Sequence, residues 1–231
     1  MIDIKVLASG SKGNCYRISD GKSSLLLDAG IPCSKISAGC GYRLSEISGC
    51  LITHIHIDHS KAAADLPRRG VPVYGPADIK HSCTELARVL EPMQPCGIGT
   101  FNVTPFIVPH DTTCYGYKIT SIATGETLVY ITDAGYFPFT FPHVDYWMIE
   151  SNYSEEILIA NVTEGIIDYV RANRVTNTHM SIEQVVRYFT DDVDASGAKQ
   201  IWLLHLSNDN SDAENFRSQI EEVTGAEVHI A

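Results

Sequence analysis

The stretch Ile52–His59, ITHIHIDH, places three histidines and an aspartate within six residues, directly after an apolar run. The run CLITH predicts a buried strand. In an extended chain, side chains two residues apart point the same way, so His54 and His56 are expected to bind one ion together. Asp58 and His59 are expected at the start of the next helix, where the chain turns and aims a second pair of ligands at a neighbouring point.

An alternative treats Asp58 as a helix N-cap and the histidines as incidental. It must explain three histidines at the end of an apolar strand, where each unpaired polar group costs about 1–3 kcal/mol. This cost favours a metal site. Four residues of one loop do not enclose two ions, so more ligands are expected at other strand ends. Three further candidates follow apolar runs: His110, Asp133 and His205.

The composition predicts one globular domain over residues 1–231. The chain is 44% hydrophobic and 19% charged, and it contains no repeat, linker or low-complexity run. Along the chain we expect strands with interspersed helices, followed by more strands and then more helices. This order predicts a sheet sandwich with helices packed outside. Helices are expected within 75–90, with Leu86 on the core face, and at 155–172, 182–191 and 212–223. Ser181 with Gln184 and Ser211 with Glu214 read as capping boxes.

The charge and the cysteines restrict the partners and the compartment. The formal net charge of −11 argues against a large nonspecific nucleic-acid surface and leaves room for a small local one. The first residues show no leader, and no apolar run approaches the roughly 18 residues of a membrane helix. Seven cysteines without a CxxC pair suit reduced, mostly buried thiols. We therefore expect a cytoplasmic protein without a membrane partner.

The candidate ligands follow one order along the chain: HxHxDH, a single histidine, the aspartate of TDAG and a last histidine after an apolar strand. This order resembles that of the metallo-β-lactamase superfamily. The resemblance runs from LASGSKGN (7–14) through LLLDAGI (25–31) and VPHD (108–111) to LLHLSNDN (203–210). It implies an α/β (α+β) fold, the αββα sandwich of two mixed β-sheets flanked by helices, with a dinuclear metal site.

Within that superfamily, SGSKGN, IESN (149–152), His179 in THMS and HLSNDN resemble the YycJ/WalJ branch, whose members are DNA exonucleases acting from 5′ ends. Thr178 departs from this pattern, because the branch has glycine before the histidine that corresponds to His179. The resemblance implies how the ligands are shared between two ions: His54, His56 and His110 on one, Asp58, His59 and His205 on the other, with Asp133 bridging.

The chemistry expected of this set is hydrolysis. Nitrogen and oxygen donors without thiolate admit two divalent ions, Zn²⁺ or Mn²⁺, with Fe or Ni as further options. A hydroxide bridging the ions would attack the substrate, with Asp58 and Asp133 among the catalytic residues. His179 precedes a helix start that favours phosphate, so it is expected to bind phosphate or protonate the leaving group; a plain loop histidine is the alternative.

Weaker candidates for substrate contact are Ser11, Lys12 and Asn152, each with a loop or turn role as the alternative. Asp111 is a candidate for orienting a ligand.

Three functions compete. The leading one is a metal-dependent phosphodiesterase, a nuclease on DNA ends with the nucleic acid in a local cleft. The second is a hydrolase of a small ester, thioester, lactone or cyclic phosphodiester, which suits the acidic surface better. The third is a noncatalytic metal-binding protein, and the complete ligand set argues against it.

Overall fold

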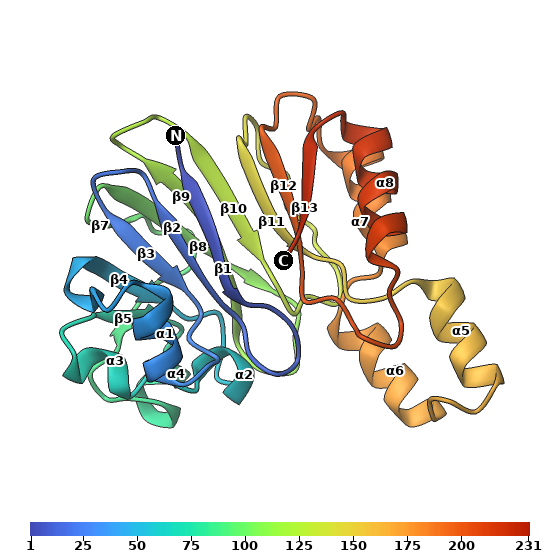
Figure 1. Cartoon of the computed structure of the whole chain (residues 1–231), viewed down its shortest axis with the longest axis horizontal. Helices are drawn as coiled ribbons and strands as arrows, with labels where there is room; N and C mark the ends of the chain where they lie inside the picture. The colour runs from blue at the N-terminus through green and yellow to red at the C-terminus, as the bar shows by residue number, and fades with distance from the viewer. The chain divides into compact units, whose positions relative to one another are not determined.

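A computed structural model describes all residues, 1–231 (Figure 1). The chain forms two compact units: unit 1 is Met1–Ile107 with Thr112–Thr127, and unit 2 is Val108–Asp111 with Leu128–Ala231. The strands belong to two mixed sheets, and helices flank them, which confirms the expected fold class.

Unit 1 contains a six-stranded sheet with the order β1-β2-β3-β4-β5-β6. Strands β1 (Asp3–Ala8), β2 (Cys15–Ser19) and β3 (Ser24–Leu27) are antiparallel, whereas β3, β4 (Ile47–Leu51), β5 (Val73–Gly75) and β6 (Arg88–Val89) are parallel. The helices α1 (Cys33–Gly39), α3 (Asp65–Arg68) and α4 (Asp78–Ser82) lie beside this sheet (Figure 1). Buried Leu26, Ile36 and Leu66 belong to the apolar cluster that joins helices and sheet.

The other face of this sheet packs on β7 (Cys96–Ile98), β8 (Phe101–Val108) and β9 (Cys114–Ser121). Tyr117 in β9 donates a hydrogen bond of 2.5 Å to the Ile52 carbonyl. A Cβ on Gly49 in β4 would stand 3.0 Å from the Ile98 side chain of β7. These contacts make a sandwich of two strand layers within unit 1.

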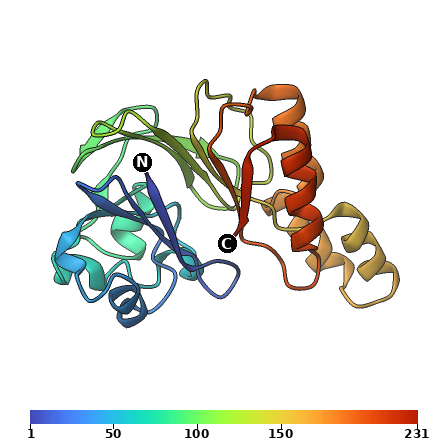
Figure 2. The same cartoon turned by 45° about the horizontal axis from the view of Figure 1, so that its top comes forward.

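Unit 2 contains four parallel strands: β10 (Thr127–Ile131), β11 (Tyr146–Glu150), β12 (Gln200–Leu204) and β13 (Glu227–Ile230). The helices α7 (Ile182–Arg187) and α8 (Ala213–Thr224) lie side by side along them, and α5 (Glu155–Thr163) and α6 (Tyr169–Thr178) form a separate hairpin (Figures 1 and 2). Because the strands are parallel, their carboxyl ends meet at one edge. The residues at this edge include Asp133, Glu150 and His205.

Several expected helices are shorter in the structure. The stretch 75–90 is helical only at Asp78–Ser82, and Leu86 is 62% exposed, so its predicted core role is wrong. The amides of Cys83 and Thr84 both donate to the Ile79 carbonyl, which ends the helix, and residues 88–89 pair with β5. The expected helix 155–172 is two helices, separated at Gly165, which has a φ of 73°.

The capping box at Ser181 is confirmed, since its hydroxyl accepts from the Gln184 amide and the Gln184 side chain accepts from the Ser181 amide. The second capping box, expected at Ser211, is wrong, because the helix is capped one residue later. The N-cap of α8 is Asp212, which accepts from the Asn215 amide. All seven cysteines are free and five are buried, as expected. None of the helices combines the length and the apolar character needed to cross a membrane.

Candidate metal centre

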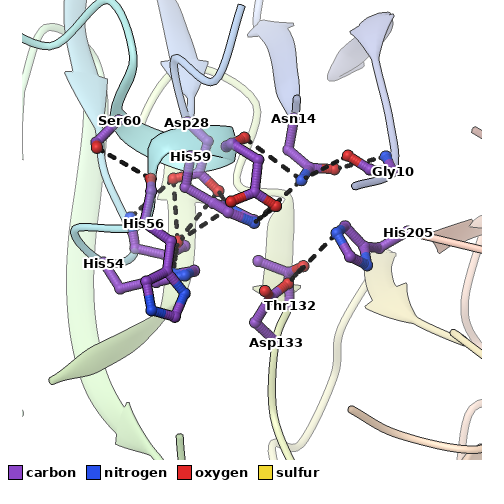
Figure 3. Close-up of polar contacts among 12 residues, drawn as sticks. Gly10, Asn14, Asp28, His54, His56, His59, Ser60, Thr132, Asp133 and His205 are labelled. Atoms are coloured by element: carbon purple, nitrogen blue, oxygen red, sulfur yellow. Dashed lines mark hydrogen bonds and ion pairs between the residues drawn. The ribbon is translucent and has the colours of Figure 1, made fainter. Parts of the chain in front are cut away.

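In unit 1, the four residues of the HxHxDH motif lie between the end of β4 and the first turn of α2 (Ile57–Ser60). Figure 3 shows the three histidines of the motif close together. The rings of His54 and His59 have centroids 4.3 Å apart, and those of His54 and His56 are 4.7 Å apart. His59 Nε2 lies 3.7 Å from an oxygen of Asp58. His54 and His59 are fully buried. The N-cap of α2 is His56, so Asp58 is in the first turn and does not cap the helix.

Asp28, which follows β3, fixes the ring of His59. Its Oδ2 lies 2.7 Å from His59 Nδ1, and its Oδ1 accepts from the Thr53 amide at 2.8 Å. The Thr53 hydroxyl in turn lies 2.9 Å from His54 Nδ1. A carboxylate on Nδ1 holds the tautomer that leaves Nε2 as the basic nitrogen, which is the arrangement typical of metal-binding histidines.

The SGSKGN loop packs against the same helix start. The Asn14 amide donates to the Asp58 carbonyl at 2.7 Å, and the Asn14 side chain binds both the amide and the carbonyl of Gly10. A Cβ on Gly30 would stand 1.6 Å from the Asp58 carbonyl oxygen, so only glycine permits this approach. Ser11 and Lys12 are exposed on the loop. The loop thus supports α2 through its backbone and Asn14.

In unit 2, a second cluster comprises Asp133, Glu150, His179 and His205, whose potential ligand atoms all lie within 4.8 Å of one another. Asp133 and His205 follow β10 and β12 with φ angles of 51° and 55°. Non-glycine residues in this left-handed region are uncommon and cluster at functional sites. The Thr132 hydroxyl donates to Asp133 at 2.8 Å, and His205 Nε2 lies 3.9 Å from Asp133 (Figure 3).

Glu150, the last residue of β11, organises this second cluster. It is fully buried, and its Oε1 lies 2.6 Å from His179 Nδ1 and 3.3 Å from His205 Nδ1. Its Oε2 accepts from the amides of Ala134 and Met180. Burial opposes ionisation of Glu150, but the charge of His179 and the hydrogen bonds of His179 and His205 together outweigh burial and lower the pKa of the carboxyl. Burial likewise opposes the charged form of His179. The negative charge and the hydrogen bond of Glu150 favour the charged form more strongly, so the pKa of His179 is raised.

Two other predicted residues lie beside the histidines of unit 2. The Asn152 side chain donates to the His205 carbonyl at 2.7 Å and lies 3.0 Å from His205 Nδ1. Asp111 lies 3.2 Å from His110 Nε2. Asn152 therefore supports the turn that carries His205.

Sequence reasoning assigned no role to Asp28 or Glu150. Both had a signal: each is an acidic residue at or just after the end of an all-buried strand segment, a position where an unpaired carboxylate would be costly. The segments LLLDAGI and IESN entered only as parts of the family pattern. The structure shows that each acid meets histidine nitrogen atoms.

The donors in each unit suit divalent metal ions. Imidazole nitrogen and carboxylate oxygen are ligands of Zn²⁺, Mn²⁺ and Fe²⁺, and both clusters hold imidazoles by a buried carboxylate on Nδ1. The raised pKa values of buried Cys15 and Cys50 keep these two thiols protonated.

Comparisons with known proteins agree with this chemistry. Residues 26–206 match the model of the beta-lactamase superfamily domain. The chain is 27% identical over 243 residues to exodeoxyribonuclease YycJ of Bacillus anthracis, covering 96% of this chain and 89% of the relative. It is 26% identical over 227 residues to exodeoxyribonuclease WalJ of Streptococcus pneumoniae serotype 2, covering 89% and 82%. The crystal structure of the metallo-beta-lactamase fold protein YhfI from Bacillus subtilis aligns with a TM-score of 0.76 at 25% identity, covering 100% and 96%.

Proposed function

Because the chain belongs to the β-lactamase superfamily, we propose that it is a metal-dependent phosphodiesterase that shortens DNA from its 5′ ends. The observation that carries this proposal is its similarity, over 89% or more of the chain, to two proteins named as exodeoxyribonucleases. The buried histidine and carboxylate clusters of both units support a hydrolase in which metal ions do the chemistry.

We assign the ligands as the family pattern implies. His54, His56 and His110 bind one ion, Asp58, His59 and His205 bind the other, and Asp133 is shared. When bound, the ions supply Lewis acidity and lower the pKa of a water molecule. The proposal treats residues 1–231 as one catalytic domain.

The chain itself supplies the proton for the leaving group in this proposal. His179 Nδ1 faces Glu150, so Nε2 is the nitrogen left for substrate. The raised pKa of His179 favours the protonated imidazole, which binds a phosphate oxygen or donates a proton to the departing oxygen.

The proposal is tested on end-labelled, 5′-phosphorylated duplex DNA with protein loaded with Mn²⁺ or Zn²⁺. We expect progressive shortening from the 5′ end by the wild type and none by Asp133→Asn, because this variant removes the shared carboxylate. Metal content is measured for both proteins. No shortening by wild-type protein with two bound ions would overturn the nuclease proposal and favour a small ester or cyclic phosphodiester as substrate, which the net charge of −11 suits.

The role of His179 is tested by leaving-group dependence. We expect His179→Ala to lower kcat on DNA by about 10²–10⁴-fold. The loss is smaller on a p-nitrophenyl phosphodiester, whose leaving group needs no proton. The exposed His81, on α4, provides the control variant His81→Ala. Full turnover on DNA by His179→Ala with both metals retained would contradict the assigned role.

A further inference from the structure

A small hollow lies entirely within unit 2, on the chain segments that follow Asp133 and His179. Its volume is about 170 Å³, and it is lined by Tyr136, Phe137, Met180, Gln184, Arg187, Tyr188 and Asp192. Met180 follows His179 directly, and Tyr136 comes three residues after Asp133. The hollow therefore adjoins two of the proposed site residues through very short stretches of chain.

The turn between Asp133 and the hollow is fixed by its backbone. The Gly135 amide donates to the Pro109 carbonyl at 3.1 Å, and the Gly135 carbonyl accepts from the Gln184 side chain at 3.3 Å. A Cβ on Gly135 would stand 2.4 Å from the Asn177 carbonyl oxygen. Two hydrogen bonds and the close approach to Asn177 thus fix the backbone between Asp133 and Tyr136.

The floor of the hollow is aromatic and rigid. The rings of Phe137 and Tyr188 meet edge to face with centroids 5.1 Å apart, and the Tyr188 hydroxyl donates to the Phe139 carbonyl. Tyr188 also packs on the fully buried Trp147. Tyr188 begins a π-helical turn, Tyr188–Asp192, a rare conformation that is frequent at functional sites.

The rim provides an exposed ring and two opposite charges. Tyr136 is 57% exposed and its ring contacts no other aromatic ring. Arg187 is exposed and makes no ion pair, and Asp192 lies on the same rim. The charges sum to zero, so an isolated phosphate gains little here. A neutral planar ring with donors and acceptors along its edge suits an aromatic floor with such a rim.

We propose that this hollow binds the base of the nucleotide whose phosphate is held beside Asp133 and His179. The inference rests on the proposed function, since it names where the strand end sits. Tyr136 stacks on the base, and Arg187 and Asp192 on the rim meet the donors and acceptors along the edge of the base. Stacking accepts every base, so the site gives affinity without sequence preference.

The test follows the methyl group of Met180 by NMR, with ¹³C-methyl methionine and Zn²⁺-loaded protein. The chain has only four methionines, and Met1 and Met93, in unit 1, are 81% and 62% exposed and serve as internal references. We expect a deoxynucleoside 5′-monophosphate to shift the Met180 signal, because the ring current of a stacked base acts on a nearby methyl. Deoxyribose 5-phosphate, which has no base, leaves the signal unchanged.

Tyr136→Ala should weaken nucleotide binding about fivefold or more, since loss of one stacking ring costs about 1–3 kcal/mol per base. Tyr136→Phe retains binding, and Tyr42→Ala, which removes a tyrosine that is 80% exposed in unit 1, has no effect. Equal Met180 shifts with the nucleotide and with the sugar phosphate, or unchanged affinity in Tyr136→Ala, would overturn the inference.

The same proteins separate this inference from the proposed function. If the wild type shortens DNA but the nucleotide does not shift the Met180 methyl signal, the proposed base site is wrong and the nuclease proposal stands. If the nucleotide shifts Met180 as expected but DNA is not shortened, the base site stands, and the substrate is a smaller nucleotide.

Discussion

At the scale of single residues, the buried acids decide how the histidines are presented. Asp28 is fully buried and meets His59 Nδ1 at 2.7 Å, while Glu150 meets His179 and His205. A carboxylate in this position makes the opposite imidazole nitrogen a better ligand or a better proton donor. Neither acid belongs to the seven predicted metal ligands, yet both orient members of the site.

Replacing Asp28 by asparagine tests this role. The amide nitrogen of Asp28→Asn would donate to His59 Nδ1 and favour the tautomer whose Nε2 carries the proton. We expect the affinity for Zn²⁺ to fall about 10–100-fold, measured by competition with a chelator of known affinity. Asp65→Asn, at an exposed position in α3, is the matched control and binds like the wild type. Equal affinities of the Asp28→Asn and Asp65→Asn proteins would remove Asp28 from the metal site.

At the scale of elements, strand ends and helix starts place the functional groups. The parallel ladder of β10, β11 and β12 brings Asp133, Glu150 and His205 to one edge. Helix starts are set by caps, and the structure moves the cap of α8 from Ser211 to Asp212, because the Asp212 side chain accepts from the Asn215 amide at 3.1 Å.

The corrected cap predicts unequal costs for two neighbouring substitutions. Asp212→Ala should lower the free energy of unfolding by about 0.5–2 kcal/mol, since it leaves an amide of the first turn without its acceptor. Ser211→Ala, outside the helix, should cost less. Urea unfolding followed by circular dichroism measures both. A larger loss in Ser211→Ala than in Asp212→Ala would restore the cap that the sequence suggested.

At the scale of the whole molecule, Asp20 ties distant parts of unit 1 together. Its Oδ1 accepts from the amides of Lys22 and Ser23, and its Oδ2 accepts from the hydroxyls of Thr100 and Ser121. Burial opposes ionisation, but these hydrogen bonds outweigh it and lower the pKa of Asp20 from 3.8 to about 2. The ionised carboxylate thus joins the β2–β3 hairpin to the strand layer that contains β8 and β9.

These hydrogen bonds of Asp20 predict a contribution to the free energy of unfolding that depends on pH. Because the pKa of Asp20 is lower in the folded state, its stabilisation is present above pH 3.8 and is lost as the pH falls towards 2. We expect Asp20→Asn to be less stable than wild type at pH 7, with a difference that shrinks between pH 4 and 2. Urea unfolding across this range measures the difference. A difference that stays constant from pH 7 to pH 2 would contradict the lowered pKa.

The sequence by itself determined the fold class, two mixed sheets flanked by helices, and it predicted the seven residues that we propose as metal ligands. Apolar strands that end in His54, His110, Asp133 or His205 are local signals, because strand periodicity and the cost of burying polar groups are visible along the chain. The capping box at Ser181 was visible for the same reason.

Only the tertiary structure decided the partners of these residues. Asp28 and His59 are 31 positions apart, and Glu150 and His179 are 29 apart, so no local pattern links them. The hollow likewise joins the turn at Tyr136 with the helix that ends in Arg187. The helix expected within 75–90 is wrong for the same reason. Its apolar periodicity did not decide the structure, because residues 88–89 pair with β5, a contact that exists only in the folded sheet.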